Sequence, residues 1–195
     1  MTPDELVTAV EGTFGVSVTT ELTRGELCVT CQPDDWIDVL TFARDTLGCA
    51  FFDWLSAVDE PDTEPPGVDV VSHVYSPRGR HRLLLRTRLA RGHQHLPTAT
   101  TVYKGANWHE RETAEMFGVT FDGHPNPLPL LLPDGFVGTP LRKEFVLASR
   151  VAKQWPGEVN PGQSLRELAP RRRRNLPPGV PDPDRWGPSA KPVEP

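Results

Sequence analysis

A proline-rich run in the second half of the chain limits what the surrounding residues can form. Pro125, Pro127 and Pro129 each lack a backbone N–H, so the stretch that contains them cannot be a regular helix or an internal strand. Leu128 and the three consecutive leucines that follow Pro129 make the same run apolar. Solvated loops are usually polar. We therefore expect an extended segment that lies on a surface, either of its own domain or of another chain.

A helix is predicted immediately before this run. Asn107 is a favoured N-cap residue, and Glu110, three positions later, completes a capping box. Ala114 and Phe117 are three residues apart, so they can share one apolar face of the helix. Gly118 is expected to end the helix, because glycine adopts the left-handed conformation at least cost.

The residues before this helix show the periodicities of a domain that mixes helices and strands. The expected segments, in order, are a helix at 2–15, strands at 16–22 and 27–31, a helix at about 33–47, strands at 50–58, 68–75 and 81–89, a loop at 92–97 and an extended stretch at 98–103. They predict an α+β fold with a mixed or antiparallel sheet covered by helices, followed by a long, extended, proline-rich C-terminal arm.

Three regions are expected along the chain. Residues 1–120 form the α+β domain, residues 121–145 form the extended arm, and residues 146–195 form a tail rich in proline and arginine. The tail shows no apolar period, so we expect it to be disordered when the chain is isolated. It contains the basic run Arg171–Arg174, which suits an acidic subunit or anionic lipid better than RNA, because no aromatic residues are interleaved.

Composition excludes several classes of protein. No run approaches the ~20 consecutive apolar residues that a membrane-spanning helix needs, and no secretory signal is evident at the N-terminus. The formal net charge of −5 argues against a general nucleic-acid binder. We expect a protein on the cytosolic side of the membrane that binds no nucleic acid.

Cys28 and Cys31 form a C-x-x-C pair, which could be a redox pair or half of a metal site. A four-cysteine site needs a second pair, and the only other cysteine is Cys49. Residues three apart on a strand point to opposite faces, so two structural residues are the favoured interpretation.

The histidines give a similarly weak metal signal. The helix of a zinc protease needs a second histidine four residues after His109, but Thr113 stands there. His93 and His95 alternate in what is predicted to be a polar loop. We expect no catalytic, cofactor or metal site in this chain. A free-standing enzyme built on Cys28 and Cys31, or on His109 and His124, remains the alternative from a different class.

The region from Asn107 to Lys143 resembles the 30 kDa subunit, also called the C subunit, of the proton-pumping NADH:quinone oxidoreductase, respiratory complex I. The resemblance depends on these runs: Asn107-Trp108-His109-Glu110-Arg111-Glu112, Met116-Phe117-Gly118, Phe121-Asp122-Gly123-His124-Pro125, Leu131-Leu132-Pro133-Asp134 and Gly138-Thr139-Pro140-Leu141-Arg142-Lys143. It covers about forty residues densely and the first hundred and five loosely.

The resemblance implies a non-catalytic subunit of the peripheral arm, on the cytoplasmic face of the cell membrane. Its partners would be the quinone-site D subunit and the cluster-bearing B and I subunits. The complex would use FMN, iron–sulfur clusters, NADH and quinone, and it would couple electron transport to proton translocation. The residues that we expect at the partner interface are Trp108, Glu110, Arg111, Glu112, Phe117, Gly118, Phe121, Gly123, His124, Pro125, Leu132, Pro133, Pro140, Leu141, Arg142 and Lys143.

The chain differs from the family pattern at His109, at Ala114-Glu115 and at Pro127-Leu128-Pro129. The family usually has an aromatic residue, a Tyr-Asp pair and basic residues at these places. These differences leave open the same role in a related enzyme that takes electrons from ferredoxin or a deazaflavin, or in a membrane-bound hydrogenase.

Overall fold

The computed structural model describes residues 1–146, and these residues belong to two compact units. The first unit comprises Met1–Leu132 and Thr139–Lys143, and the described residues of the second are Pro133–Gly138 and 144–146. The first unit contains every helix and strand described below. The predicted disordered tail lies, from residue 147 onward, outside the described residues.

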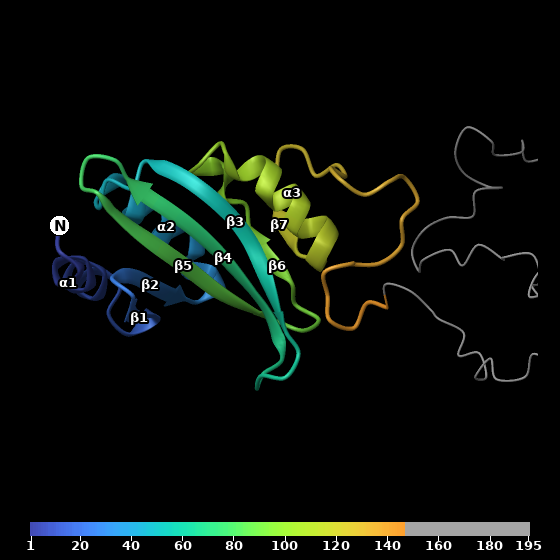
Figure 1. The fold of residues 1–195 in the computed structure, drawn as a ribbon, viewed down its shortest axis with the longest axis horizontal. Coiled ribbons are helices and arrows are strands. Elements are labelled where there is room, and N and C mark those ends of the chain that lie inside the picture. Colours follow the sequence, from blue (N-terminus) through green and yellow to red (C-terminus); the bar gives the residue numbers. More distant parts are fainter. Residues whose placement is uncertain (147–195) are drawn as a thin grey trace, which may run out of the picture. The chain divides into compact units, whose positions relative to one another are not determined.

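The first unit combines helices with runs of consecutive strands, as the sequence predicts (Figure 1). The α-helices are α1 (Pro3–Phe14), α2 (Trp36–Asp45) and α3 (Ala106–Phe117). The strands are β1 (Val18–Thr23), β2 (Glu26–Cys31), β3 (Phe51–Glu60), β4 (Gly67–Ser76), β5 (His81–Ala90), β6 (His95–Pro97) and β7 (Thr120–Asp122). Short 3₁₀ turns occupy Gly15–Ser17, Pro33–Asp35 and Ala99–Thr101. The predicted α+β class is confirmed.

The main sheet is mixed, with the strand order β1-β2-β5-β4-β3. Three of its strand pairs are antiparallel, whereas β2 and β5 run parallel, with Leu27 opposite Leu83. A parallel pair needs a crossover connection, and the chain from α2 through β4 supplies it. A second, two-stranded sheet pairs β6 with β7 in parallel, with Leu96 opposite Phe121.

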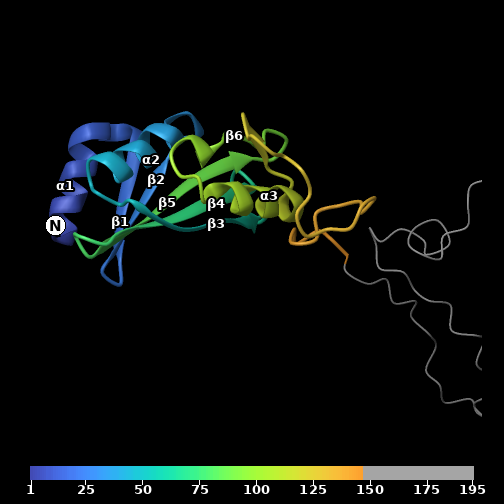
Figure 2. The ribbon, with the colours of Figure 1, turned by 90° about the horizontal axis from the view of Figure 1, so that it is seen from above.

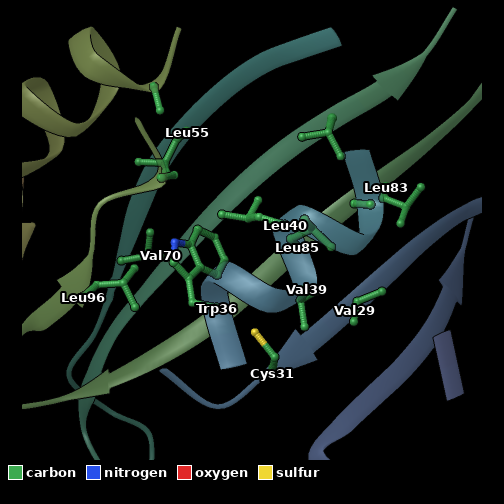
Figure 3. Close-up of a cluster of buried hydrophobic side chains, with 14 of the residues drawn as sticks. Val29, Cys31, Trp36, Val39, Leu40, Leu55, Val70, Leu83, Leu85 and Leu96 are labelled. Carbon is green, nitrogen blue, oxygen red and sulfur yellow. The ribbon is translucent and has the colours of Figure 1, made fainter. Parts of the chain in front are cut away.

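The core lies between the sheet and helices α1 and α2, which cover one of its faces (Figure 2). Alternate residues of β5 point inward, and Leu83 and Leu85 are almost completely buried. Trp36 and Leu40 of α2 pack against this face (Figure 3), and both side chains are fully buried. This burial of large apolar side chains is the main stabilising contribution to the domain.

Two local predictions between β5 and α3 are wrong. Residues 98–103 were expected to be extended, but Ala99–Thr101 form a 3₁₀ turn in which the Thr98 side chain accepts a hydrogen bond from the Thr100 N–H. Residues 92–97 were expected to be a loop, but they contain β6. The partner of β6 is β7, some 25 residues later, so no local sequence pattern could indicate this pairing.

The described part of the second unit contains an aromatic contact. The rings of Phe136 and Phe145 are tilted by 31°, with centroids 6.0 Å apart. Gly138 has φ 114°, and a β-carbon there would lie 2.7 Å from the Phe145 ring. Glycine is therefore required at this position, both for the backbone conformation and for the close approach of the ring.

Gly67, at the start of β4, tests the packing of the central strands. A β-carbon at this position would lie 2.4 Å from the Leu89 carbonyl oxygen of β5. We expect Gly67→Ala to lower the free energy of unfolding by about 1–3 kcal/mol, because the backbones of two strands must move apart. Urea denaturation of the purified chain measures this change.

Gly12→Ala is the matched control. Gly12 is a helical residue of α1, and nothing lies within 4 Å of the place that a β-carbon would occupy there. The same substitution at Gly12 should raise the free energy of unfolding by roughly 0.5–1 kcal/mol, because alanine loses less backbone entropy in a helix. Equal effects of the two substitutions would contradict the close contact at Gly67.

Candidate functional site

Helix α3 lies beside β3 and begins one residue before the predicted N-cap (Figure 1). Gly105 is the N-cap residue and gives no side-chain cap, so the predicted capping box of Asn107 and Glu110 is wrong. A β-carbon at Gly105 would lie 3.3 Å from the Phe52 ring of β3. The close approach of α3 and β3 thus favours glycine at this position. Because Glu110 takes no part in a cap, its carboxyl group can make other contacts.

Glu110 is fully buried and ties α3 to the 3₁₀ turn before it. Its carboxylate accepts hydrogen bonds from the Thr98 hydroxyl at 2.5 Å and from the Ala99 backbone N–H at 2.6 Å. The Thr100 hydroxyl lies 2.8 Å from that of Thr98 and extends the network. Burial raises the pKa of Glu110 to about 7, although the two hydrogen bonds partly oppose this shift.

His124 connects the turn after β7 to the same part of α3. The Asn126 backbone N–H donates to its Nδ1 at 3.0 Å, so the ring hydrogen must be on Nε2. Nε2 then donates to the Asn107 carbonyl oxygen at 3.2 Å, and it lies 3.7 Å from a carboxylate oxygen of Glu110. Only 3% of the His124 side chain is exposed, so its role within this chain is to fix the turn.

Arg111 holds the proline-rich run from one side. Its guanidinium donates to the carbonyl oxygens of Leu128 and Pro129, both at 2.7 Å. A proline-rich backbone cannot satisfy its carbonyl groups through regular structure, and the planar guanidinium fork can bind two of them at once.

Glu115 holds the same run from the other side. Its carboxylate accepts hydrogen bonds from the backbone N–H groups of Leu130, Leu131 and Leu132, and the contacts to the last two are 2.9 and 3.3 Å long. Successive N–H groups directed at one anion form a nest. Arg111 and Glu115 are four residues apart and thus share one face of α3. We call these two side chains and residues 128–132 the α3 clamp.

The Pro140–Lys143 motif docks at the other end of α3, within the same unit. The Leu141 N–H donates to the Met116 carbonyl at 3.1 Å. The Arg142 guanidinium donates to the Phe117 carbonyl oxygen at 2.6 Å and to the Gln94 side chain. The Lys143 N–H donates to the Asp59 carboxylate at 2.8 Å, which ties the motif to β3.

Gly118 allows this docking. Its φ of 73° is left-handed, as predicted for a helix end. A β-carbon at Gly118 would lie 3.1 Å from the Thr139 methyl group and 3.4 Å from the Arg142 guanidinium. Any larger residue would push the motif away from the end of α3.

The clamp leaves apolar side chains exposed. Leu128 and Leu131 are 63% and 59% exposed, and Trp108, one turn before Arg111 on α3, is 67% exposed. An open cavity of about 360 Å³ lies between α3 and the run that follows it. Its lining includes Ala114, Val119 and Pro127. This part of the first unit therefore presents both apolar projections and an apolar hollow.

Apart from Pro133, which belongs to the second unit, the residues predicted for a partner interface gather on and around α3, but the accessibility of the whole set differs. Exposed residues are Trp108, Glu112, Gly123, Pro125, Pro133, Leu141 and Lys143. Partly exposed ones are Arg111, Gly118, Leu132, Pro140 and Arg142, and His124 is partly exposed only through its backbone, because its side chain is buried. Glu110, Phe117 and Phe121 are buried inside this chain. Buried residues can influence an interface only by positioning the exposed ones.

Sequence reasoning missed four residues that hold this arrangement: Glu115, Thr98, Gln94 and Asp59. A signal existed for Glu115, because it stands four residues after Arg111 on the same helix face. The other three lie outside α3, Asp59 on β3 and Thr98 and Gln94 in the chain that leads to the helix, and no local pattern indicates their contacts.

The thiols do not form a redox pair in this structure. Cys31 is buried and Cys28 is half-buried, on alternate faces of β2 as predicted. Burial raises the pKa of Cys31, and likewise of Cys49, to about 12. Across residues 1–146, no group of three or more His, Cys, Asp or Glu side chains could hold a metal ion. The same residues contain no helix long and apolar enough to cross a membrane.

Comparisons with known proteins agree with this architecture. The family model described as respiratory-chain NADH dehydrogenase, 30 Kd subunit, matches residues 29–151. The C 1 subunit of NADH-quinone oxidoreductase from Rhizobium meliloti is 40% identical over 142 residues, which cover 71% of this chain and 69% of the relative. The corresponding C subunit from Roseiflexus castenholzii is 39% identical over 128 residues, covering 65% of this chain and 73% of the relative.

Two solved structures share the fold. One is a trypsin-resistant fragment (1-134) of Nqo5, with a TM-score of 0.55 and 25% identity, covering 62% of this chain and 98% of the fragment. The other belongs to an archaeal membrane-bound sulfane sulfur reductase, with a TM-score of 0.57 and 22% identity, covering 67% of this chain and 77% of that one.

The fold and the α3 region thus define a subunit of a respiratory oxidoreductase complex. The chain belongs to the 30 kDa subunit family of respiratory-chain NADH dehydrogenase, complex I, whose bacterial relatives are the C subunits of NADH-quinone oxidoreductase. Its role is that of a complex I subunit in respiratory electron transport, and its partners are other subunits of that complex.

Glu110 predicts a specific pH dependence of stability. Its pKa is higher in the folded chain, about 7, than the ~4.3 expected in the unfolded chain. The folded state therefore binds more protons between these values, and stability falls as the pH rises from about 4.5 to about 7. We expect this contribution to reach about 3 kcal/mol at most, and to be absent in Glu110→Gln.

Urea denaturation of both proteins at pH 4.5 to 8 measures the difference. The wild type should lose stability relative to Glu110→Gln across this interval, with no further relative change above pH 8. Parallel stability profiles for the two proteins would show that Glu110 ionises as it does in the unfolded chain.

The α3 clamp predicts local protection of backbone amides. Glu115→Ala should speed hydrogen exchange at Leu131 and Leu132 about tenfold, because a charged acceptor of their hydrogen bonds is lost. Glu112→Ala is the control, because Glu112 has the same charge and helix but is exposed. Mass spectrometry of exchanged peptides that span residues 126–135 reports the rates. Equal exchange in the two variants would exclude a clamping role for Glu115.

Proposed function

We propose that this chain is a non-catalytic scaffold of a proton-translocating NADH:quinone oxidoreductase. In this role it binds the quinone-site D subunit and the cluster-bearing B and I subunits during electron transfer from NADH to quinone. FMN, the iron–sulfur clusters, NADH and quinone would be bound by the other subunits. The chain would be peripheral, on the cytoplasmic face of the cell membrane, and attached to it through the complex.

One observation carries this proposal: the α3 clamp uses polar groups to hold an apolar segment in place. Arg111 and Glu115 satisfy the backbone of residues 128–132, whereas the Leu128 and Leu131 side chains remain exposed. A segment that is already ordered loses less conformational entropy on binding. An exposed apolar cluster of this kind is typical of a protein–protein interface.

The buried residues of the predicted interface support the same role indirectly. Glu110 and His124 fix the segments that flank α3, and Arg142 holds the Pro140–Lys143 motif on the helix end. We propose that these residues position the interface, while Trp108, Leu128, Leu131 and Leu141 contact the partner.

Affinity purification from gently solubilised membranes tests the assignment. The tagged chain should recover the quinone-site, cluster and flavin subunits, and the eluate should reduce quinone with NADH. Recovery of the quinone-site partners without flavin subunits would instead assign the chain to an enzyme that uses another donor, such as ferredoxin. Recovery of the chain alone would contradict the scaffold role.

Leu131→Asp should impair assembly without unfolding the chain. A carboxylate at this exposed position would have to be desolvated in an apolar interface, so we expect the amount of assembled complex to fall at least about tenfold. Native gel electrophoresis and NADH:quinone activity per assembled complex are the measurements. Val16→Asp is the control, because Val16 is fully exposed and lies far from α3 in the sequence.

Substitutions at Arg142 and Lys143 test whether these residues act in assembly of the complex or in catalysis. Alanine at either position should lower the amount of assembled complex, while the complexes that do form should keep their activity. Fully assembled complexes that no longer reduce quinone would contradict a purely structural role for this motif.

A further inference from the structure

Two turns at one end of the main sheet carry arginine residues. The β1–β2 turn contains Arg24, and the β4–β5 turn contains Arg80. Because β2 and β5 run parallel, with Leu27 opposite Leu83, both strands begin at the same end of the sheet. The two turns therefore lie near each other, beside the start of α1 (Figure 1). This end of the sheet plays no part in the α3 clamp.

A depression of about 340 Å³ lies between these turns and α1. Its polar lining includes Arg24, Arg80, His81 and Arg82. Among the described residues that line it, Glu26 is the only acid, and its carboxylate pairs with Arg82 at 3.1 Å. The depression is thus basic, although the whole chain has a net charge of −5.

Arg24 and Arg80 have no partner in the described part of the chain. Both are exposed, and within residues 1–146 neither side chain makes a hydrogen bond or an ion pair. His81 is fixed between them and the core, since its Nε2 lies 2.9 Å from the Leu47 carbonyl oxygen. The two guanidinium groups are therefore free to bind a ligand.

The backbone at both arginines is unfavourable for this residue type. Arg24 has φ 54° and Arg80 has φ 53°, a left-handed conformation that arginine rarely adopts. Gly25 also has a positive φ, so the Arg24-Gly25 pair forms a tight hairpin turn in which asparagine is the favoured first residue. Asparagine would suit the left-handed backbone of these turns better than arginine does. What arginine adds is a positive charge on a long side chain.

We propose that this depression binds a phosphate-bearing anion between Arg24 and Arg80. Guanidinium groups bind the oxygens of phosphate in a bidentate manner. The volume is near the lower limit of small-ligand sites, which suits one or two phosphate groups rather than a whole nucleotide. The inference is independent of the scaffold role, because it concerns a different end of the first unit.

Pyrophosphate is a suitable probe, and the full-length chain can be titrated with it at low salt. In ¹H–¹⁵N NMR spectra, the amide signals of Gly25, His81 and Arg82 should shift together and saturate. Arg80→Asn should weaken pyrophosphate binding about tenfold, as expected when one charged hydrogen-bonding partner is lost. The melting temperature should stay the same or rise, because asparagine tolerates the left-handed conformation.

Arg78→Asn is the matched control. Arg78 is an exposed residue of the same turn, but it does not line the depression. This variant should bind pyrophosphate within about twofold of the wild type. If Arg78→Asn and Arg80→Asn weakened pyrophosphate binding equally, the anion would be attracted by the positive charge of the whole turn. That result would overturn the proposed site. Amide shifts that do not saturate would overturn it as well.

A sedimentation experiment with lipid vesicles distinguishes two possible sources of the phosphate group. If the natural ligand is a lipid headgroup, the wild type and Arg78→Asn should sediment with vesicles that contain phosphatidylglycerol, whereas Arg80→Asn should not. None of the three proteins should sediment with vesicles of pure phosphatidylcholine. If it is a soluble phosphate compound, pyrophosphate should bind as described and neither kind of vesicle should sediment the chain.

Discussion

The backbone of a proline-rich segment needs hydrogen-bond partners that regular secondary structure cannot give it, and α3 provides them. Arg111 binds two carbonyl groups and Glu115 binds three N–H groups of residues 128–132. Unpaired polar backbone groups at this surface would oppose the burial of the leucines in any interface. Because side chains of the helix satisfy them, the leucines can be presented as an apolar surface.

The buried carboxyl group of Glu110 has a complementary part in this arrangement. It connects α3 with the 3₁₀ turn at Ala99–Thr101 and lies close to His124, which holds the turn after β7. Three successive segments of the chain thus meet at one acid. Burial of Glu110 raises the pKa of its carboxyl group, because the ionised form is removed from water. Such buried networks specify geometry more than they stabilise the fold, which is consistent with positioning the clamp.

Much of the fold could be predicted from the chain. The hydrophobic alternation of β2 and β5 and the helical periodicity of α2 indicate their elements, because each buries one face in the core. The glycine that ends α3 was also predicted, because a left-handed residue there favours glycine. By contrast, β6 and the turn at Ala99–Thr101 were missed. Their structure depends on contacts with β7 and Glu110, which lie outside these two segments, so no pattern within the segments indicates it.

The candidate site likewise has some features that the sequence predicts and others that only the structure shows. The sequence alone determined the family, through the resemblance of its signature runs. It also determined the helix that is followed by an extended proline-rich run, and the glycine between them, because these depend on local conformational preferences of named residue types. Only the tertiary structure decided which of the signature residues are accessible. It buries Glu110 and Phe117, turns Arg111 toward the backbone of residues 128–129, and leaves Leu128 and Leu131 exposed. Burial and hydrogen-bond partners are set by which segments meet in space, and that information is not contained in any single stretch of the chain.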